Sequence, residues 1–325
     1  MGKVEIKRLG VLLVLLFGLV AAACGGPTSA PLATSSPEVT NSPAGSGSSG
    51  ESSGEEAAGS PRDEIFVAVD GSGDYATLDE AVAAAAPRAT ITLGPGMYRL
   101  LRGLEIDTSL TLIGAGMDET EIVSGAPEHV VRFTGSGSFS AEGITFRHDG
   151  KQVADVVVIE DGTGRFSSCR FTGAIYEEGD GNRAGLRFRG SSRGAVENSI
   201  ASGNDNTGFL VEQQAQPELT GNICSDNGLV GIGYMDLAKG LVSENECTGN
   251  VIGIALAVES KPTLARNKSN DNDYGIAYMD NAGGENYDNE IMRNKIGISI
   301  GGSSTVQLGD NVVRDNTEED IRDSR

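Results

Sequence analysis

A short repeat in the second half of the chain constrains the fold more than any other feature. A glycine followed by apolar residues recurs there with spacings of 23, 23, 22, 22 and 22 residues. The copies are GLRF, GFLV, GIGY, GIAL, GIAY and GISI, which begin at Gly185, Gly208, Gly231, Gly253, Gly275 and Gly297. A fixed period of this size indicates a solenoid, in which each unit stacks on its neighbours and equivalent residues form ladders.

The segments between the copies decide the type of solenoid. They carry Gly, Asn and β-branched residues without helical periodicity, and they lack the L-x-x-L-x-L-x-x-N signature of leucine-rich repeats. A coil of 22 residues at about 3.3 Å per residue has a perimeter of about 70 Å, which fits three parallel strands per coil. We therefore predict an all-β, right-handed parallel β-helix, with the handedness that parallel crossover connections usually have.

Alternation along the strands predicts which side chains fill the interior. The inward rows are Ile232, Ile254, Ile276, Ile298 and Tyr234, Leu256, Tyr278, Ile300. Two asparagine rows also recur, Asn222, Asn245, Asn267, Asn289, Asn311 and Asn227, Asn250, Asn272, Asn294, Asn316. We interpret them as turn ladders, because Asn tolerates left-handed backbone and its amide can hydrogen-bond from coil to coil.

Cysteine and histidine usage indicates neither a disulfide framework nor a metal site. Cys224 and Cys247 fall at equivalent places of adjacent coils, in a row that also holds Ile200. We expect free, inward thiols, because the parallel Cβ directions of a stack suit a disulfide poorly. His129 and His148 stand in different coils, so we expect no metal site and no cofactor.

The first residues resemble a lipoprotein export signal. A basic start and an apolar stretch precede Ala21, Ala22, Ala23 and Cys24. The run AAACGG resembles the lipobox of bacterial lipoproteins, although Ala21 stands where Leu is usual, and the resemblance covers residues 1–26. It implies removal of residues 1–23, a lipid on Cys24, and a membrane-anchored protein at the cell surface or in the periplasm. The alternative is plain secretion with cleavage after Ala23.

Composition predicts a disordered tether and argues against a nucleic-acid partner. Residues 24–62 are rich in Gly, Ser, Pro and Thr, and we predict a disordered tether. The chain has 25 Lys and Arg against 46 Asp and Glu, a net charge of -21. Because duplex binding requires a basic footprint, we expect no nucleic-acid partner. We also expect a monomer.

Residues 63–103 are predicted to cap the solenoid with a strand, a helix and a strand, ahead of the β-helix over residues 104–325. Leu78, Ala81, Val82 and Ala85 share one helical face. Thr77 with Glu80 forms the pattern of a capping box.

The sequence of the cap resembles a known family. VAVDGSGDYATLDEAVAAA and ITLGPGMY, within residues 67–98, resemble the start of pectin methylesterases. The esterases' downstream QDTL, DFIFG and LGRPW motifs have no counterpart. From Leu104 onward the chain is similar to pectin-lyase-like β-helix repeat proteins. The resemblance therefore implies the fold and the cap, and no catalytic residue.

A first candidate site is an outward strip of small residues. Gly233, Ala255 and Ala277 should form it, bordered by Glu212, Gln213, Asp236, Glu259 and Asp280. Acidic and amide side chains are suitable hydrogen-bond partners for sugar hydroxyls, and a row of them suits a polymer. The alternative is an ordinary solvated face of the solenoid.

A second candidate site surrounds an insertion at residues 174–184 (AIYEEGDGNRA), which interrupts the period and is expected to project as a loop. Tyr176, Glu177 and Asp180 would then wall a groove beside Arg187 and Arg189. The alternatives are a mobile surface loop and, for Arg189 with its acidic neighbours in adjacent coils, a structural stack of ion pairs.

Three functions remain open at this stage. The first is a surface β-helix protein that binds or processes extracellular polysaccharide. The second is a non-catalytic accessory protein that binds another envelope protein. The third is a polysaccharide lyase or glycoside hydrolase whose acids lie in the earlier coils. Whether the protein is an enzyme is not decided by the sequence, because fold does not fix function.

Overall fold

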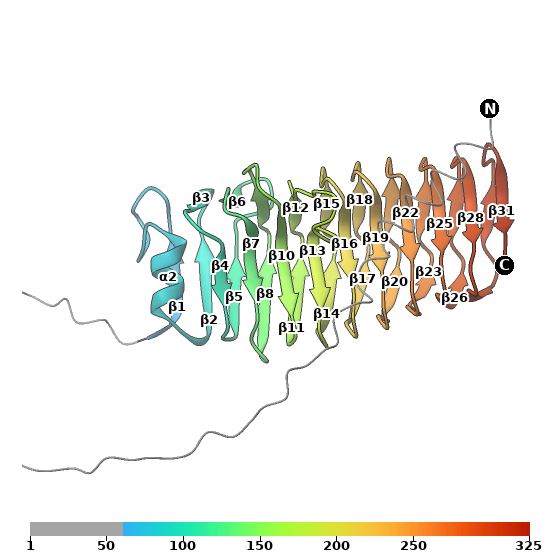
Figure 1. Ribbon diagram of the computed structural model, residues 1–325. Helices are drawn as coiled ribbons and strands as arrows, with labels where there is room; N and C mark the ends of the chain where they lie inside the picture. The colour runs from blue at the N-terminus through green and yellow to red at the C-terminus, as the bar shows by residue number, and fades with distance from the viewer. Residues whose placement is uncertain (1–60) are drawn as a thin grey trace, which may run out of the picture. The chain divides into compact units, whose positions relative to one another are not determined.

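Three parallel β-sheets run through residues 61–325, the part of the chain that the computed structural model describes. From β2 onward, successive strands enter sheets A, B and C in turn, so each strand pairs with the one three places later. This winding confirms the predicted right-handed parallel β-helix (Figure 1). The predicted export signal, Cys24 and nearly all of the tether lie outside the described residues.

The strands are short and evenly distributed over the three sheets. Sheet A contains β1 (Arg62–Val67), β2 (Ala85–Leu93), β5 (Leu110–Ile113), β8 (Ser138–Glu142), β11 (Thr163–Ser167), β14 (Arg193–Glu197), β17 (Gln216–Thr220), β20 (Leu241–Ser243), β23 (Thr263–Ala265), β26 (Gly283–Tyr287) and β29 (Thr305–Leu308). Sheet B contains β3 (Gly96–Leu100), β6 (Thr120–Ser124), β9 (Thr145–His148), β12 (Arg170–Thr172), β15 (Ile200–Ser202), β18 (Ile223–Ser225), β21 (Glu246–Thr248), β24 (Lys268–Asn270), β27 (Glu290–Met292) and β30 (Val312–Arg314). Sheet C contains β4 (Leu104–Ile106), β7 (Glu128–Phe133), β10 (Ala154–Glu160), β13 (Ala184–Arg189), β16 (Thr207–Val211), β19 (Val230–Tyr234), β22 (Ile252–Leu256), β25 (Tyr274–Tyr278), β28 (Ile296–Ile300) and β31 (Glu319–Asp323).

The interior changes character along the solenoid. In the later coils it is filled by the two predicted inward rows, from Ile232 to Ile298 and from Tyr234 to Ile300, and each member is at most 1% exposed. In the earlier coils it is filled by phenylalanines whose neighbouring ring centroids lie 5.4 to 6.5 Å apart. These are Phe133, Phe139, Phe146, Phe166, Phe171, Phe188 and Phe209.

Both asparagine rows form the predicted hydrogen-bonded ladders. The side-chain oxygen of Asn245 accepts from the backbone N and from Nδ2 of Asn222, at 3.0 and 2.9 Å. Nδ2 of Asn245 donates in turn to the Leu219 carbonyl at 2.9 Å. The expected left-handed backbone at the asparagines is wrong: it falls one residue earlier, for example at Gly221 (φ 66°) and Glu244 (φ 59°). The preceding residue turns the chain, and the asparagine then satisfies the buried backbone groups.

The helix α2 (Leu78–Ala84) covers the N-terminal end of the stack (Figure 1). The Thr77 hydroxyl accepts from the Glu80 backbone N, and Leu78 and Ala81 are buried, as the sequence predicts. Ala85 is the C-cap, where the backbone is already extended and β2 begins. None of the helices in residues 61–325 is long and apolar enough to cross a bilayer.

Candidate functional site

The strands of sheet C pair in register, so equivalent residues of successive coils lie side by side. Their outward side chains form three rows along the outer face of the sheet. The first row contains His129, Asp155, Ala184, Thr207, Val230, Ile252, Tyr274 and Ile296. The second contains Glu105, Arg132, Val158, Arg187, Leu210, Gly233, Ala255, Ala277 and Ser299. The third begins with Glu160, Arg189, Glu212 and Met235. Most members of the rows are polar at β7 to β13, with Val158 and Ala184 as exceptions, and most are aliphatic or small from β19 onward.

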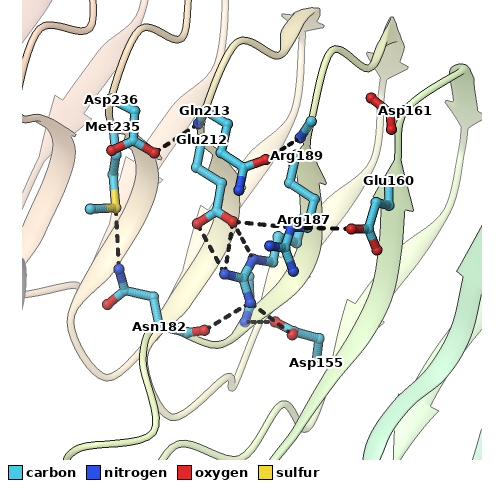
Figure 2. A network of polar contacts seen from close by, with 12 residues as sticks. Asp155, Glu160, Asp161, Asn182, Arg187, Arg189, Glu212, Gln213, Met235 and Asp236 are labelled. Atoms are coloured by element: carbon cyan, nitrogen blue, oxygen red, sulfur yellow. Dashed lines mark hydrogen bonds and ion pairs between the residues drawn. The ribbon is translucent and has the colours of Figure 1, made fainter. Parts of the chain in front are cut away.

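Arg187 is the centre of the polar part of this face. Its Nη2 lies 2.8 and 3.0 Å from the two carboxylate oxygens of Glu212, and its Nη1 lies 3.2 Å from Oδ2 of Asp155 (Figure 2). The three side chains are only 11%, 9% and 5% exposed. Burial opposes the charge of Arg187, but the two carboxylates outweigh it and raise the pKa of the guanidinium.

The ion pairs continue toward the N-terminal end of the face. Arg189 Nε lies 3.5 Å from Glu212 and 3.9 Å from Glu160, which is the structural stack that the sequence suggested. Arg132 bonds Glu160 from the preceding coil. His129 is buried. Its Nε2 lies 3.1 Å from the Glu105 carboxylate, but the contact does not have hydrogen-bond geometry, and Nε2 has no other partner. Burial lowers the pKa of His129, although the Glu105 carboxylate acts in the opposite direction.

The insertion at residues 174–184 does not project freely, which corrects the expectation for it. Ile175 exchanges backbone hydrogen bonds with Ala154 at 3.0 and 3.1 Å, forming an antiparallel bridge. At the other end, the Asn182 carbonyl accepts from Arg187, and Asn182 Nδ2 lies 3.2 Å from the sulfur of Met235 (Figure 2). Both ends are therefore fixed to the solenoid, and only the central residues 177–181 are exposed.

A cavity of about 740 Å³ lies between this insertion and the turns before β7 and β10. The insertion contributes Tyr176, Glu177, Asp180 and Arg183 to its wall. The other side is formed by Pro127, Glu128, Lys151, Gln152 and Val153. Burial raises the pKa of the Tyr176 phenol, and nearby Glu178 raises it further, so the hydroxyl stays protonated at neutral pH.

The second candidate groove is thus divided in the structure. Tyr176, Glu177 and Asp180 line the cavity, whereas Arg187 and Arg189 belong to the ion-pair network and do not line it. Arg183 links the two, because it lines the cavity and its Nη1 lies 3.7 Å from Asp155.

The sequence did not single out several residues of this region. Glu128 is the first residue of β7, and Lys151 and Gln152 stand in the turn before β10; none of them belongs to a motif. Asp155 resembles an ordinary polar residue at the start of a strand. Their proximity to the insertion depends on its folded path. No local signal in the sequence indicates that path.

The first candidate strip is placed on the aliphatic part of sheet C. Gly233, Ala255 and Ala277 are buried among neighbouring outward side chains, and a side chain at Gly233 would meet Leu210, Val230 and Thr207. The strip therefore presents little surface of its own, and its role in ligand binding stays a prediction.

The polar residues bordering the strip mostly have partners within the solenoid. Gln213, Asp236 and Asp280 have left-handed backbones in the turn after sheet C. Their side chains accept from backbone N atoms of the preceding coil, Gly190 at 2.7 Å, Gln213 at 2.9 Å and Val258 at 3.3 Å. Glu212 is bound by Arg187, and Glu259 is exposed.

The cysteines have a purely interior position. Cys224 and Cys247 pair in register and are buried as free thiols, which confirms the prediction. Ile200 is not in their row: Ala201 pairs with Cys224, and Ile200 pairs with Ile223. Within residues 61–325 no group of three His, Cys, Asp or Glu is arranged to hold a metal ion.

Comparisons with known proteins agree with this architecture. The model of a family described as "Right handed beta helix region" matches residues 155–317, half of the chain. No curated protein matches the chain in sequence.

Three solved structures illustrate the structural similarity. The A-module of an Azotobacter vinelandii mannuronan C-5 epimerase is 18% identical with a TM-score of 0.58, and the alignment covers 74% of this chain and 72% of that one. An alginate lyase from Paenibacillus sp. is 12% identical with a TM-score of 0.55, over 80% and 99% of the two chains. The Dettilon tailspike protein is 12% identical with a TM-score of 0.57, over 76% and 59%. At these identities the similarity shows the fold alone.

Proposed function

The chain belongs to the right-handed β-helix family, and we propose that it binds extracellular polysaccharide in the cavity beside sheet C. The observation that carries the proposal is the cavity itself. It exists where the insertion at residues 174–184 interrupts the coil period and folds back against the turns before β7 and β10. Ligand sites are concave and combine an apolar surface with a few convergent polar groups.

The cavity wall has the chemistry that sugar recognition requires. The Tyr176 ring provides an aromatic surface for the C–H face of a pyranose, and its protonated hydroxyl can donate a hydrogen bond. The carboxylates of Glu128, Glu177 and Asp180 accept from sugar hydroxyls. Lys151 and Arg183 add positive charge for a carboxylated sugar.

The names of the structural neighbours support a polymeric ligand. Two are named as an epimerase of mannuronan and a lyase of alginate, and both have TM-scores above 0.5. Their named polymers, together with Lys151 and Arg183 as contacts for sugar carboxylates, suggest an acidic polysaccharide; the three carboxylates of the same wall mean that the charge of the cavity alone does not select one.

Binding is favoured over turnover by the ion pairs on the adjacent sheet. Asp155, Glu160 and Glu212 are each held by at least one arginine. These three carboxylates are engaged in ion pairs and do not line the cavity, so they are poorly placed to act on a ligand bound there. A lyase or glycoside hydrolase is therefore the less supported alternative.

The experiment is a binding assay on a panel of acidic and neutral polysaccharides with residues 61–325, scored for affinity and for newly formed chain ends. Tyr176→Ala and Lys151→Ala should each weaken binding at least tenfold. The matched controls Tyr287→Ala, on sheet A, and Lys239→Ala, in a turn outside the cavity, should leave affinity unchanged. Equal losses in the controls would contradict the cavity assignment, and new chain ends would make the protein an enzyme.

A second function, docking of another envelope protein, has less support, because the aliphatic outward residues Val230, Ile252 and Ile296 of sheet C are at most 2% exposed. A panel without binding to any glycan would favour this second function.

We also propose that Cys24 carries a lipid and that the tether holds the β-helix at the cell surface or in the periplasm. The motif AAACGG and the composition of residues 24–62 support this location. Metabolic labelling with a fatty acid tests it: label should enter the full-length chain and be absent from Cys24→Ser. Label in both forms, or in neither, would contradict lipidation.

A further inference from the structure

We infer that His148 is a positioning residue of the cavity and that it acts in its protonated form. Its ring joins the two walls of the cavity while both ring nitrogens carry a proton, and the joint weakens when one proton is lost. The effect on a ligand rests on the proposed polysaccharide binding, whereas the joint between the walls does not.

The imidazole of His148 bridges the coils on either side of its own. His148 ends β9, directly before the turn of residues 149–153, and is only 3% exposed. Its Nε2 lies 3.0 Å from the Ala126 carbonyl oxygen, and its Nδ1 lies 3.2 Å from the Gly173 carbonyl oxygen. Ala126 directly precedes Pro127 in one wall of the cavity, and Gly173 directly precedes the insertion that forms the other wall. One buried ring therefore connects both walls.

The two partners of the ring require two protons on it. Both contacts have the geometry of N–H donors, and a carbonyl oxygen can only accept. A neutral imidazole has a single N–H, so its second nitrogen would direct a lone pair at a carbonyl oxygen. Within residues 61–325 neither carbonyl accepts another hydrogen bond. Because an unpaired buried carbonyl is costly, the bridged arrangement fits the imidazolium and not the neutral ring.

The charged groups around the ring are compatible with a proton there. The pKa of Asp149, the next residue, is lowered chiefly by hydrogen bonds from Arg99, and a positive charge on His148 lowers it further. The same attraction stabilises the imidazolium. Arg99, Arg147 and Arg170 are each paired with a carboxylate, which offsets their repulsion of the ring. The other charged or titratable side chains on the adjacent strands and in the cavity wall are Glu121 on β6, Glu128 on β7, Lys151, Tyr176 and Glu177.

The asparagine ladder indicates why a bridging side chain is needed at this place. The ladder that holds the turns after sheet B ends at Asn204, whose side-chain oxygen accepts from the Ala174 backbone N at 3.0 Å. Ala174 has no amide with which to continue it. One coil earlier, His148 links backbone groups of adjacent coils instead. Unlike an asparagine amide, an imidazole changes its hydrogen-bonding capacity between pH 5 and 8.

The sign of the pH dependence follows from the number of ring protons. Both hydrogen bonds are present at the acidic end of the range in which imidazoles titrate, and one is lost as the pH rises through it. Loss of one buried hydrogen bond changes an equilibrium by about tenfold. The cavity should therefore be held most firmly at mildly acidic pH.

The first measurement needs no polysaccharide and uses residues 61–325, which form one compact unit with its own core. The chain contains two histidines, so NMR spectra of labelled imidazoles can be assigned with His129→Gln. At pH 5.5 both nitrogens of His148 should carry slowly exchanging protons. The hydrogen-exchange protection factor of the Ile175 amide, which donates to Ala154 across the cavity wall, should fall about tenfold between pH 5.5 and pH 8.

The matched controls separate this effect from general opening of the solenoid. The protection factor of the Tyr274 amide, bonded to Val251 in the later coils, should stay constant over the same range. In His148→Gln the Ile175 amide should lose its pH dependence, and in His129→Gln it should keep it. A single protonated nitrogen at pH 5.5, or an Ile175 protection factor in the wild type that is constant or rises with pH, would overturn the inference.

The second measurement is binding of a polysaccharide identified in the panel, at pH 5.5 and at pH 8. Affinity should weaken about tenfold at the higher pH in the wild type and in His129→Gln, and should be independent of pH in His148→Gln. An equal pH dependence in the wild type and His148→Gln would show that His148 does not position the cavity for its ligand. If no polysaccharide binds, the proposed function fails, while the NMR measurement still decides the role of His148.

Discussion

The earlier and later coils use the same backbone and stabilise it in different ways. Up to β16 the interior is filled by phenylalanine rings, and the outer face of sheet C carries a network of arginines and carboxylates. After β16 the interior contains Ile, Leu and Tyr beside two asparagine ladders, and the same outer face is aliphatic. The difference teaches that a parallel β-helix fixes where side chains point and leaves their chemistry open. Irregular coils can therefore carry a cavity while regular coils continue the stack.

The largest effect is expected for a central ladder asparagine in the later coils. Asn245→Ala removes the acceptor for two donors of Asn222 and the donor to Leu219, all in the buried interior. Each unpaired buried group costs about 1–3 kcal/mol, so the free energy of unfolding should fall by about 4 to 5 kcal/mol. Urea denaturation followed by circular dichroism measures it. Asn311→Ala, at the more exposed end of the same ladder, should cost much less, and similar losses at both positions would contradict a ladder that acts through burial.

The next effect is expected in the ion-pair network of the earlier coils. Arg187→Leu introduces the residue type of the following coil, Leu210, and leaves Asp155 and Glu212 buried without their main partner. Stability should fall by about 3 to 4 kcal/mol.

The matched triple variant sharpens the comparison between the two regions. Asp155→Val/Arg187→Leu/Glu212→Met gives the earlier coils the apolar residue types that follow in the same rows, Val230, Leu210 and Met235. Most of the lost stability should return, because no buried charge is left unpaired. Recovery will be incomplete, since Ala184 N loses its acceptor on Asp155. If the triple variant is less stable than Arg187→Leu, the hydrogen bonds and ion pairs of Asp155, Arg187 and Glu212 stabilise these coils beyond the balance of their charges.

A smaller effect is expected in the phenylalanine stack. Phe166 contacts four other rings, Phe139, Phe146, Phe171 and Phe188. Phe166→Leu keeps an apolar side chain and should cost about 1.5 kcal/mol. Phe66→Leu, at a ring 41% exposed, should cost almost nothing in the same denaturation experiment. Equal costs would show that the stack adds nothing beyond ordinary burial.

The smallest effect is a pH dependence from His129. Its folded pKa is lowered from 6.5, chiefly by burial. The unfolded chain therefore binds the proton more readily, so this contribution to stability is complete above pH 6.5 and is lost as the pH falls toward the folded pKa. Thermal unfolding of the wild type and of His129→Gln between pH 7.5 and pH 5 should show a steeper decline for the wild type. Parallel curves would contradict a buried neutral imidazole.

The sequence predicts the fold well because each copy of the repeat forms one coil of the solenoid. The inward rows, the asparagine ladders and the pairing of Cys224 with Cys247 follow from counting 22 or 23 residues per coil. The misplacement of Ile200 shows the limit of counting. The step back from Cys224 is 23 residues and ends at Ala201, and an error of one residue moves a side chain to the other face of the sheet.

The candidate site is less predictable, because it depends on contacts that follow no period. Asn182 reaches Met235 in a coil two turns later, and Arg183 lies between Asp155 and the cavity. The path of the insertion between these contacts determines the cavity, and no propensity or motif in residues 174–184 encodes it. Tyr176 and Asp180 were identified because they break the pattern, whereas Lys151 and Glu128 do not.

The register of the coils also makes the protein a molecular ruler. Sheet A has 11 strands, so its first and last strands are separated by ten steps of about 4.8 Å, roughly 48 Å in total. In the regular coils the turn residue and the ladder asparagine recur with every repeat. A whole coil can therefore be gained or lost in evolution while the coils on either side of it keep the same kinds of contact. Each such event would change the span by about 4.8 Å, which makes reach a property that this chain can adjust in fixed increments.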